Sequence, residues 1–372
     1  MIRIGITGQN GFTGSNLFNT LALYKEEFEL VPFERNYFEN IEKLKKFVAQ
    51  CDVIVHLAAM NRHPDLNVVY ETNVSLVKKL IGALEAVNSK AHVLFSSSSQ
   101  EQLNNIYGQS KKEGRELLNA WAERSGGKFT GLLIPNVFGP FGKPNYNSFI
   151  ATFCHKLTHG ETPEVRQDAD VNLIYVDELT EIIIDQIRKD ETQPEFIVPY
   201  TTTRKVSDVL KLLNAYKDLY FLKGEIPIIT DRFELNLFNT FRSYFDIKNH
   251  YPVKLVQHTD PRGAFVEVIR LGIGGQCSFS TTMPGITRGN HFHTRKIERF
   301  AVIRGKALIQ LRKIGTDEVL NFQLDGNEPA YVDMPIWYTH NIKNIGDQEL
   351  YTIFWINEPY NPKDADTYFE TV

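Results

Sequence analysis

The chain has 372 residues, enough for two domains that each bury a core. Charged residues make up 23% of the sequence and the net charge is −4, so no basic surface for nucleic acid is expected. The three cysteines, Cys51, Cys154 and Cys277, form no CxxC pair, which argues against a disulfide framework and for a reducing compartment. No signal-peptide pattern is visible, and no apolar run approaches the ~18 residues of a membrane span, so we expect a cytoplasmic protein without a membrane partner.

Strand and helix patterns alternate through the first part of the chain. Apolar strand patterns occupy residues 2–7, 28–33, 52–58, 92–96 and 130–134, and helical patterns occupy 14–24, 41–49, 74–87 and 111–123. This alternation predicts an α/β fold with a doubly wound parallel sheet. From about residue 144 to 243 the pattern is looser, with helical stretches at 179–188 and 206–216, as expected for a small substrate-binding lobe.

The pattern changes near residue 245. From residue 254 onward, short strand patterns such as "FVEVIR" and "LYTIFWI" alternate with Gly and Pro turns. Even strand spacing with regular turns predicts an antiparallel barrel or sandwich. We therefore predict two domains, 1–245 and 246–372.

A glycine-rich turn, "GITGQNGFTG", joins the first predicted strand to the first predicted helix. Gly8, Gly11 and Gly14 would allow a tight turn and the close approach of a pyrophosphate, which then rests on the helix N-terminus. A plain structural turn can carry the same glycines. The strand–turn–helix context favours a dinucleotide site.

The second predicted strand ends in "FERN". An acidic residue at this place binds a ribose hydroxyl, whereas an arginine accommodates the 2′-phosphate of NADP. Here Glu34 and Arg35 are adjacent, and we favour Arg35 and NADPH. The alternative is that Arg35 is a solvated loop residue.

The segment "YGQSK" places Tyr107 and Lys111 one helical turn apart. A phenol has a pKa near 10, and a neighbouring ammonium is expected to lower that pKa toward working pH. The run Ser96 to Ser99 ends the preceding strand, where a hydroxyl can hydrogen-bond a substrate carbonyl. A chance YxxxK is common, but together with the serines and the glycine turn it indicates a reductase site.

Residues 1 to about 243 resemble the extended short-chain dehydrogenases/reductases that modify nucleotide sugars. The matching segments are "TGQNGFTG", "VIVHLAAMN", "YETNVSLVKKLI", "LFSSSS", "YGQSK", "IPNVFGPFGKPNYNS" and "NLIYVDEL". The resemblance implies a Ser–Tyr–Lys catalytic set of Tyr107, Lys111 and Ser98, with Ser97 and Ser99 as competing serines. Only the short loop "QEQLNNI" separates the serines from Tyr107, where relatives often have a longer one, so we expect a more open pocket.

The same resemblance implies binding residues. Those on the cofactor side are Gly8, Gly11, Phe12, Gly14, Arg35, Ala58, Asn73, Tyr107 and Lys111. Those on the substrate side are Asn136, Lys143, Asn145 and Asn147.

The segment "PGITRGNHFHTRKIERFAVIRG" has the pattern of a metal site on a hairpin. His291 and His293 would project from one face of a strand, Glu298 can return to the same point after a turn, and His340 lies further downstream. Three imidazoles and one carboxylate suit a divalent metal such as zinc. The alternative is a hairpin whose histidines bind no metal.

This spacing resembles that of the cupins, whose fold is a jelly roll. Gly285, His291, His293, Glu298 and Gly305 match the first cupin motif. The stretch from Pro335 to Asn344 is similar to the second motif, except that Trp337 stands where a glycine is usual.

The C-terminal part also resembles the metal-free 3,5-epimerases of dTDP-4-keto-6-deoxy sugars, through "DPRGAFVEVI" and "ITRGNHFH". That resemblance implies nucleotide contacts for Arg262 and Arg288, since a guanidinium binds phosphate bidentately. In that family a histidine is the base. Because His291 is an expected metal ligand here, the base stays open, with Lys296, Tyr338 and Tyr351 as alternatives.

Over essentially the whole chain, a reductase followed by a cupin resembles a family of bifunctional enzymes of capsular polysaccharide synthesis. The resemblance implies a UDP-2-acetamido-2,6-dideoxy-β-L-arabino-4-hexulose substrate and a product of the L-talose type, a precursor of UDP-N-acetyl-L-fucosamine. The cupin would epimerise C3 and the reductase would then reduce C4 with NADPH. A C–H beside a ketone is acidic and its enolate is stabilised by a Lewis acid, so this order has a chemical reason: once C4 is an alcohol, C3 is no longer acidic.

Two other interpretations stay open. The cupin can be a binding or dimerisation module with a structural metal, or the reductase-like domain can be a dehydratase or 4-epimerase that retains NAD. A homodimer is expected, because cupins and extended reductases often dimerise.

Overall fold

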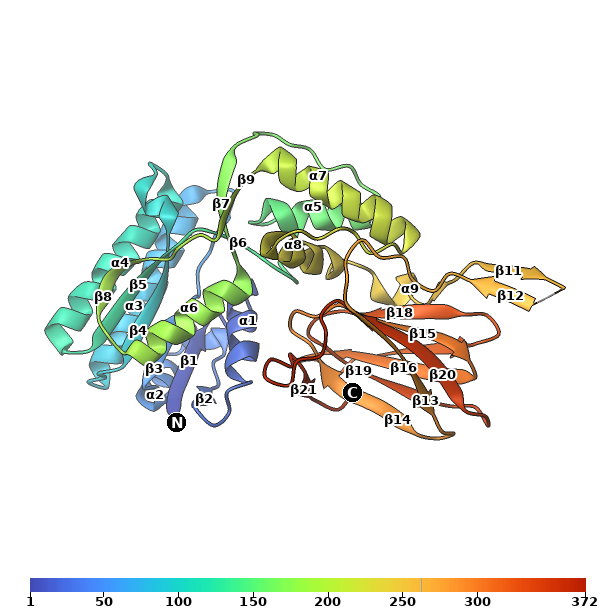
Figure 1. Cartoon of the computed structure of the whole chain (residues 1–372). Coiled ribbons are helices and arrows are strands. Elements are labelled where there is room, and N and C mark those ends of the chain that lie inside the picture. The colour runs from blue at the N-terminus through green and yellow to red at the C-terminus, as the bar shows by residue number, and fades with distance from the viewer. Residues whose placement is uncertain (262) are drawn as a thin grey trace. The chain divides into compact units, whose positions relative to one another are not determined.

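The computed structural model describes residues 1–261 and 263–372, which form two compact units (Figure 1). The N-terminal unit consists of Met1–Thr152 and Arg166–Val206, and the C-terminal unit consists of Phe153–Val165 and Ser207–Val372. No helix among the described residues is long and apolar enough to span a membrane.

A six-stranded parallel sheet of order β2-β1-β3-β4-β5-β8 forms the centre of the N-terminal unit. Its strands are β1 (Ile2–Thr7), β2 (Phe28–Val31), β3 (Val53–His56), β4 (His92–Ser98), β5 (Lys128–Ile134) and β8 (Gln193–Ile197). The helices are α1 (Phe12–Leu21), α2 (Ile41–Gln50), α3 (Leu66–Ala86), α4 (Ile106–Ser125) and α6 (Val176–Lys189), with short turns η1 (Arg35–Glu39) and η2 (Ser99–Gln102). A small sheet of β6 (Asn136–Phe138), β7 (Asp170–Tyr175) and β9 (Thr202–Lys205) completes the unit.

Apolar side chains are buried on both faces of the large sheet. One core contains residues of α2, α3 and α4, among them Phe47, Leu80 and Trp121. The other contains residues of α1 and α6, among them Leu17 and Ile183. Helices therefore cover both faces, as Figure 1 shows, and the predicted doubly wound fold is confirmed.

Helix α4 is longer than the helix predicted from the sequence. It begins after Asn105, whose side chain accepts a hydrogen bond of 2.7 Å from the Gly108 amide, and it ends at Gly126, which has φ +73°. The predicted helix began only at Lys111. The asparagine cap extends it by a turn, so Tyr107 and Lys111 lie on one helix.

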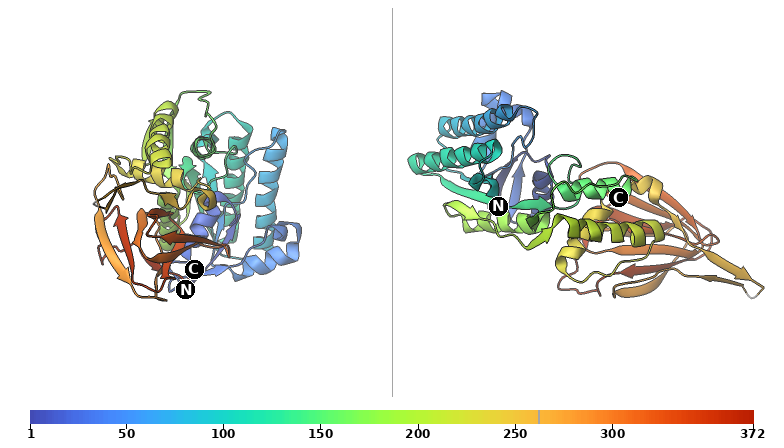
Figure 2. Two further views of the ribbon diagram at one scale, coloured as in Figure 1. Left: turned by 90° about the vertical axis from the view of Figure 1, so that its right-hand side faces the viewer. Right: turned by 90° about the horizontal axis from the view of Figure 1, so that it is seen from above.

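The C-terminal unit contains two five-stranded antiparallel sheets, of order β10-β18-β15-β20-β13 and β17-β16-β19-β14-β21, coloured orange to red in Figures 1 and 2. The first sheet has β10 (Val253–Lys254), β13 (Gln276–Thr282), β15 (Glu298–Arg304), β18 (Ala330–Met334) and β20 (Leu350–Ile356). The second has β14 (Thr287–Phe292), β16 (Lys306–Lys313), β17 (Val319–Asp325), β19 (Tyr338–Asn344) and β21 (Tyr368–Phe369). The hairpin of β11 (Gln257–Asp260) and β12 (Gly263–Val266) is separate.

The two sheets pack face to face. The ring of Phe300 on β15 lies 5.9 Å from the ring of His340 on β19 and 6.0 Å from the ring of Phe354 on β20. Side chains from both sheets thus meet in one interior, and the predicted all-β fold of this region is confirmed.

The helices α5 (Phe149–Thr158), α7 (Val206–Tyr216), α8 (Arg232–Arg242) and α9 (Ile247–His250) and the turn η3 (Lys217–Phe221) precede the sheets. Most of their residues group with the C-terminal unit, so the division differs from the boundary predicted at residue 245.

A buried polar network explains this grouping. The Arg242 guanidinium at the end of α8 donates to the carbonyl of Met334 (2.8 Å), and the Tyr220 hydroxyl donates to Asp333 (2.6 Å). On the same outer face of the first sheet, Arg299 binds both carboxylate oxygens of Asp333, at 2.6 and 2.9 Å. These bonds attach the helices to β15 and β18.

We predict that Asp333→Asn destabilises the C-terminal unit by about 3–5 kcal/mol, because it leaves the buried guanidinium of Arg299 without its counter-charge. The measurement is urea unfolding followed by tryptophan fluorescence in a Trp121→Phe background. The two remaining tryptophans, Trp337 and Trp355, both lie in the C-terminal unit, so the fluorescence reports on that unit.

The matched control is Glu328→Gln. Glu328 pairs with Lys254 at 2.6 Å, but both side chains are at least 70% exposed. Its loss should cost no more than about 1 kcal/mol. Equal losses in the free energy of unfolding for the two variants would show that the buried Arg299–Asp333 pair does not hold the helices.

Candidate active sites

The turn between β1 and α1 requires glycine at two positions. Gly8 has φ +77°, and a Cβ there would lie 2.8 Å from the backbone nitrogen of Ala58. A Cβ on Gly14 would lie 2.2 Å from the carbonyl oxygen of Gly8. Gly11 precedes α1 without a side-chain cap, and Phe12 opens the helix, so an anion has access to the helix N-terminus. This turn fits the pyrophosphate of a dinucleotide.

The end of β2 lies beside this turn. The Gln9 side-chain amide donates to the carbonyl of Phe33 (2.9 Å), which links the glycine turn to the end of the strand. Arg35 follows at the start of η1 and is exposed. In dinucleotide folds this is the place of the ribose 2′ position, so Arg35 is available to a 2′-phosphate.

Asn73 on α3 holds the loop that follows β3. Its side-chain oxygen accepts from the Met60 amide (2.7 Å), and its side-chain nitrogen donates to the Met60 carbonyl and to the Ser110 hydroxyl, both at 3.0 Å. The side chain of Asn73 therefore fixes the segment that passes the cofactor turn at Ala58.

Tyr107, which is half-buried, and Lys111, which is buried, lie close together on α4. The Lys111 ammonium donates to the carbonyl of Ser96 (2.7 Å) and lies 5.8 Å from the centre of the Tyr107 ring. Burial lowers the pKa of Lys111 to about 8. Burial, with a smaller contribution from Tyr146, raises the pKa of Tyr107 to about 12. The sequence led us to expect a lowered phenol pKa. The pKa is raised instead, so Tyr107 is a protonated phenol at neutral pH.

The serines at the end of β4 differ in their hydrogen bonds. Ser96 donates to a backbone carbonyl of β3 (3.2 Å), and Ser97 donates to the Glu101 carboxylate. Ser98 accepts from the backbone amide two residues on (3.1 Å), which leaves its own hydroxyl proton to be donated. The fourth serine is exposed at the start of η2. The geometry therefore favours Ser98 over its neighbours.

Two cations from different loops, Lys143 and Arg62, lie near Tyr146, the neighbour of Tyr107. The Lys143 ammonium lies 5.3 Å from the centre of the Tyr146 ring, and Arg62 donates to the carbonyl of Asn145 (3.4 Å). A pocket of about 480 Å³ is lined by Arg62, His63, Pro64 and Tyr146. Sequence reasoning missed these lining residues, although the segment "NRHP" directly follows the matched "HLAAM".

The two remaining asparagines predicted on the substrate side are exposed. Asn136 on β6 has one contact at the limit of a hydrogen bond, 3.5 Å to the carbonyl of Asn172, and Asn147 lies in the exposed part of the loop.

In the C-terminal unit, the structure brings together the four side chains predicted as metal ligands. One ligand atom from each of His291, His293, Glu298 and His340 lies within 4.8 Å of the others. They come from β14, the turn after it, β15 and β19, so both sheets contribute. The Glu298 carboxylate lies 3.3 Å from His293 Nε2 and 3.1 Å from His340 Nε2.

Backbone carbonyls orient two of these imidazoles. His293 Nδ1 lies 2.6 Å from the carbonyl oxygen of Asp366, and His340 Nδ1 lies 3.1 Å from that of Tyr338. A carbonyl can only accept, so each Nδ1 carries the hydrogen and each Nε2 faces the cluster. Burial, followed by the two neighbouring imidazoles, lowers the pKa of His291 to about 4, which keeps it neutral. The donor set fits a divalent metal such as zinc.

Trp337 keeps the backbone conformation of the glycine usual at its position. It has φ +60°, a left-handed conformation that costs a side-chain-bearing residue roughly 1–2 kcal/mol. Its amide donates to the His293 carbonyl (2.8 Å), and its ring stacks on Phe292 at 5.5 Å. The tryptophan therefore packs on Phe292, the residue between the two histidines.

Arg288 on β14 is held by β13, because its guanidinium donates to the Thr282 hydroxyl and to the Thr281 carbonyl, both at 3.1 Å. Its register partner on β19 is Ile342, two residues from His340. The other arginine predicted to contact nucleotide, Arg262, lies outside the described residues.

The alternative bases occupy different environments. The Lys296 ammonium is buried and donates to the carbonyl of Ala365 (2.7 Å). Phe354 on β20 points into the interior between the sheets, and Tyr351, three residues earlier on that strand, points to the opposite face. The Tyr351 hydroxyl donates to Glu349 (3.0 Å). Tyr338 is two residues from His340 on one strand, so of these three it alone shares the ligands' face.

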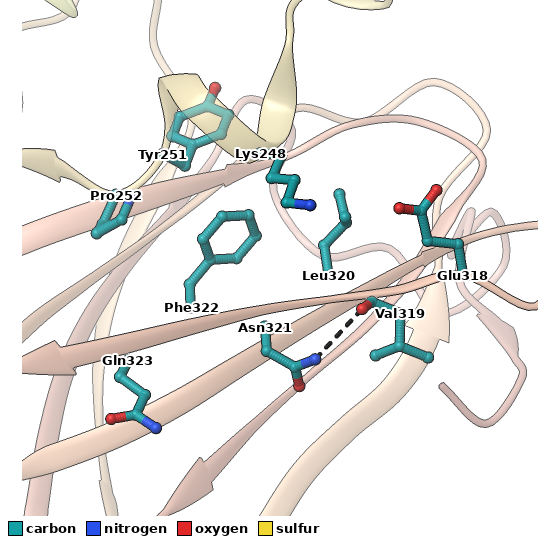
Figure 3. Close-up of a pocket in the computed structure, with 9 residues that line it drawn as sticks. All are labelled: Lys248, Tyr251, Pro252, Glu318, Val319, Leu320, Asn321, Phe322 and Gln323. Carbon is teal, nitrogen blue, oxygen red and sulfur yellow. Dashed lines mark hydrogen bonds between the residues drawn. The ribbon is translucent and has the colours of Figure 1, made fainter.

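A further pocket of about 500 Å³ lies in the C-terminal unit between β17 and the segment after α9 (Figure 3). Lys248, Tyr251 and Pro252 line one side, and residues 318–323 line the other. None of the predicted site residues lines it.

Residues 4–198 match the NAD dependent epimerase/dehydratase family, and residues 258–368 match the polysaccharide biosynthesis C-terminal domain. The chain is 29% identical over 375 residues to the UDP-2-acetamido-2,6-beta-L-arabino-hexul-4-ose reductase of Pseudomonas aeruginosa, covering 99% of this chain and 98% of that protein.

Among solved structures, the capsular polysaccharide assembling protein CapF from Staphylococcus aureus is 35% identical, covers 100% of both chains and has a TM-score of 0.62. The structure of RMD from Pseudomonas aeruginosa complexed with NADPH is 20% identical over 59% of this chain and 83% of that chain, with a TM-score of 0.53, and so shares the fold. The chain therefore belongs to the NAD-dependent epimerase/dehydratase family and, over its full length, to the same family as the capsular polysaccharide assembling protein CapF.

Proposed function

We propose that this chain is a bifunctional nucleotide-sugar enzyme. The C-terminal unit epimerises C3 of a UDP-4-keto-6-deoxy-N-acetylhexosamine, and the N-terminal unit then reduces C4 with NADPH to a product of the L-talose type. The observation that carries the proposal is the presence in one chain of a Tyr107–Lys111 site and a four-ligand cluster. The Pseudomonas aeruginosa relative that matches 99% of this chain is named as a reductase of such a 4-keto sugar. A homodimer stays a prediction.

For reduction, bound NADPH supplies the hydride that C4 receives. Tyr107 donates its phenolic proton to the C4 oxygen, and Ser98 holds that oxygen through its uncommitted hydroxyl proton. The Lys111 ammonium stabilises the phenolate that Tyr107 leaves. The basic pocket at Arg62 and Tyr146 is where we place the charged part of the substrate.

For epimerisation, the reacting bond is the C–H at C3 beside the C4 ketone. A divalent metal held by His291, His293, Glu298 and His340 would supply Lewis acidity toward the ketone oxygen. Arg288, held in place by its two hydrogen bonds to β13, binds the diphosphate. Because only the ketone makes C3–H acidic, epimerisation precedes reduction.

We expect Tyr107→Phe to lower kcat for NADPH oxidation by about 10²–10⁴-fold, because the proton donor is lost while the ring stays. The measurement is NADPH absorbance with the keto sugar as substrate. Tyr70→Phe is the matched control, since Tyr70 on α3 bonds Glu113 on the next helix and should leave kcat unchanged. Tightly bound NAD with no turnover of free NADPH would instead indicate a dehydratase or 4-epimerase.

The pH profile of the reductase tests the role of Lys111. Its pKa is about 8, and a lysine carries charge below its pKa, so kcat/KM should fall as pH rises through about 8. The Lys111→Met variant should have a low kcat/KM at every pH, and its kcat/KM should not fall as pH rises through about 8. A wild-type profile that stays flat well above pH 8 would contradict the assignment.

Metal removal separates the two activities. Without NADPH, the protein in deuterium oxide should exchange the C3 hydrogen of the keto sugar, and a chelator or Glu298→Gln should abolish this exchange. NADPH oxidation with an already epimerised keto sugar should survive both treatments. Metal-loaded protein that shows no exchange would indicate that the C-terminal unit is a binding module.

A further inference from the structure

The loop between His293 and Glu298 is bound by a segment near the end of the chain. The Asp366 carboxylate accepts from three successive backbone amides, those of Thr294, Arg295 and Lys296, each at 3.0 Å. It also accepts from the Thr294 hydroxyl (2.7 Å). Asp366 is only 5% exposed, so its carboxylate is committed to this loop.

The same residue reaches the metal cluster through its backbone. Its carbonyl oxygen is the partner of His293 Nδ1, at 2.6 Å. Asp366 has φ +41°, a left-handed conformation that is uncommon outside glycine, asparagine and aspartate. In this conformation its carbonyl binds the imidazole while its carboxylate binds the loop that follows it.

Two side chains of the loop bind the same segment. The buried Lys296 ammonium donates to the Ala365 carbonyl (2.7 Å). The Arg295 guanidinium donates to the Asp364 carboxylate (2.8 Å). Each residue from 293 to 296, in the turn that leads to Glu298, therefore has a hydrogen bond to the segment 364–366.

We propose that Asp366 is a positioning residue of the metal centre. It fixes the ring of His293 through its carbonyl, and it fixes the backbone path from His293 to Glu298 through its carboxylate. The ligand geometry is thereby preorganised by a segment that lies outside both histidine motifs. This inference rests on the proposed metal-dependent function of the C-terminal unit.

The test uses the full chain and two substitutions that tolerate the left-handed backbone. Asp366→Gly keeps the carbonyl and the φ angle but removes the carboxylate. Asp366→Asn keeps one acceptor oxygen and provides a variant expected to fold. Zinc affinity is measured by chelator competition, and the coordination geometry is followed by the visible absorption of Co²⁺-loaded protein.

We expect Asp366→Gly to weaken zinc binding about 10–100-fold and to change the Co²⁺ spectrum, with Asp366→Asn intermediate. Asp364→Asn is the matched control. It lies in the same segment and bonds Arg295 but contacts no ligand, so it should leave both readouts unchanged.

Wild-type affinity and an unchanged Co²⁺ spectrum in both Asp366 variants would overturn the proposal. Weaker zinc binding with an unchanged spectrum would also overturn it, because the ligand geometry would then not depend on Asp366. If the wild-type chain binds zinc but does not exchange C3–H, the proposed epimerase function fails while the role of Asp366 stands. If the wild-type chain binds no zinc, both fail.

Discussion

The C-terminal unit depends on the burial of one carboxylate among three imidazoles. Glu298 begins β15 and is 6% exposed, and His293 and His340 contact it from the other sheet and its turn. An isolated buried carboxylate is costly, so the site has to supply opposite charge or hydrogen bonds. Contact with the two imidazoles holds the pKa of Glu298 below its usual value against the effect of burial.

The surrounding structure is organised around this cluster. Trp337 has a left-handed backbone and stacks on Phe292 between the histidines, and Asp366 binds the loop between two of the predicted metal ligands. On the opposite face of β15, Arg299 pairs with Asp333 and so joins the strand to the helices before it. Each of these residues constrains a strand or turn next to a predicted metal ligand, and such constraints would keep a metal site to one geometry.

In the N-terminal unit the buried charged group is an ammonium, that of Lys111, rather than a carboxylate. Lys111 has its ammonium near Tyr107 and one hydrogen bond to the carbonyl of Ser96. The low dielectric around the pair disfavours the charged form of each group. The phenol keeps its proton until a negative charge develops on the substrate oxygen, and the lysine titrates close to working pH. In the proposed function both sites act on one ketone, which would be a chemical reason for joining them in one chain.

Residues fixed by local rules were predictable from the sequence. The glycine turn, the helical spacing of Tyr107 and Lys111 and the spacing of the histidine pair all express backbone geometry over a few residues. Contacts between distant segments were not predictable: Asp366 lies 73 positions after His293, and an aspartate in an irregular tail has no local signal. The preference for Ser98 over its neighbours depends on hydrogen-bond partners that the sequence does not show. The same holds for the attachment of α8 to β18, which depends on the long-range bond from Arg242 to Met334. The raised pKa of Tyr107 reflects burial, which the spacing alone does not show.

The central claim is that one ketone is used twice, first to acidify C3 and then to accept hydride at C4. The direct measurement is a reaction of the keto sugar with NADPH and metal-loaded protein in deuterium oxide, followed by analysis of the product. The account predicts deuterium at C3, inverted configuration at C3 and an alcohol at C4. A product that is reduced at C4 but keeps its original hydrogen and configuration at C3 would contradict it.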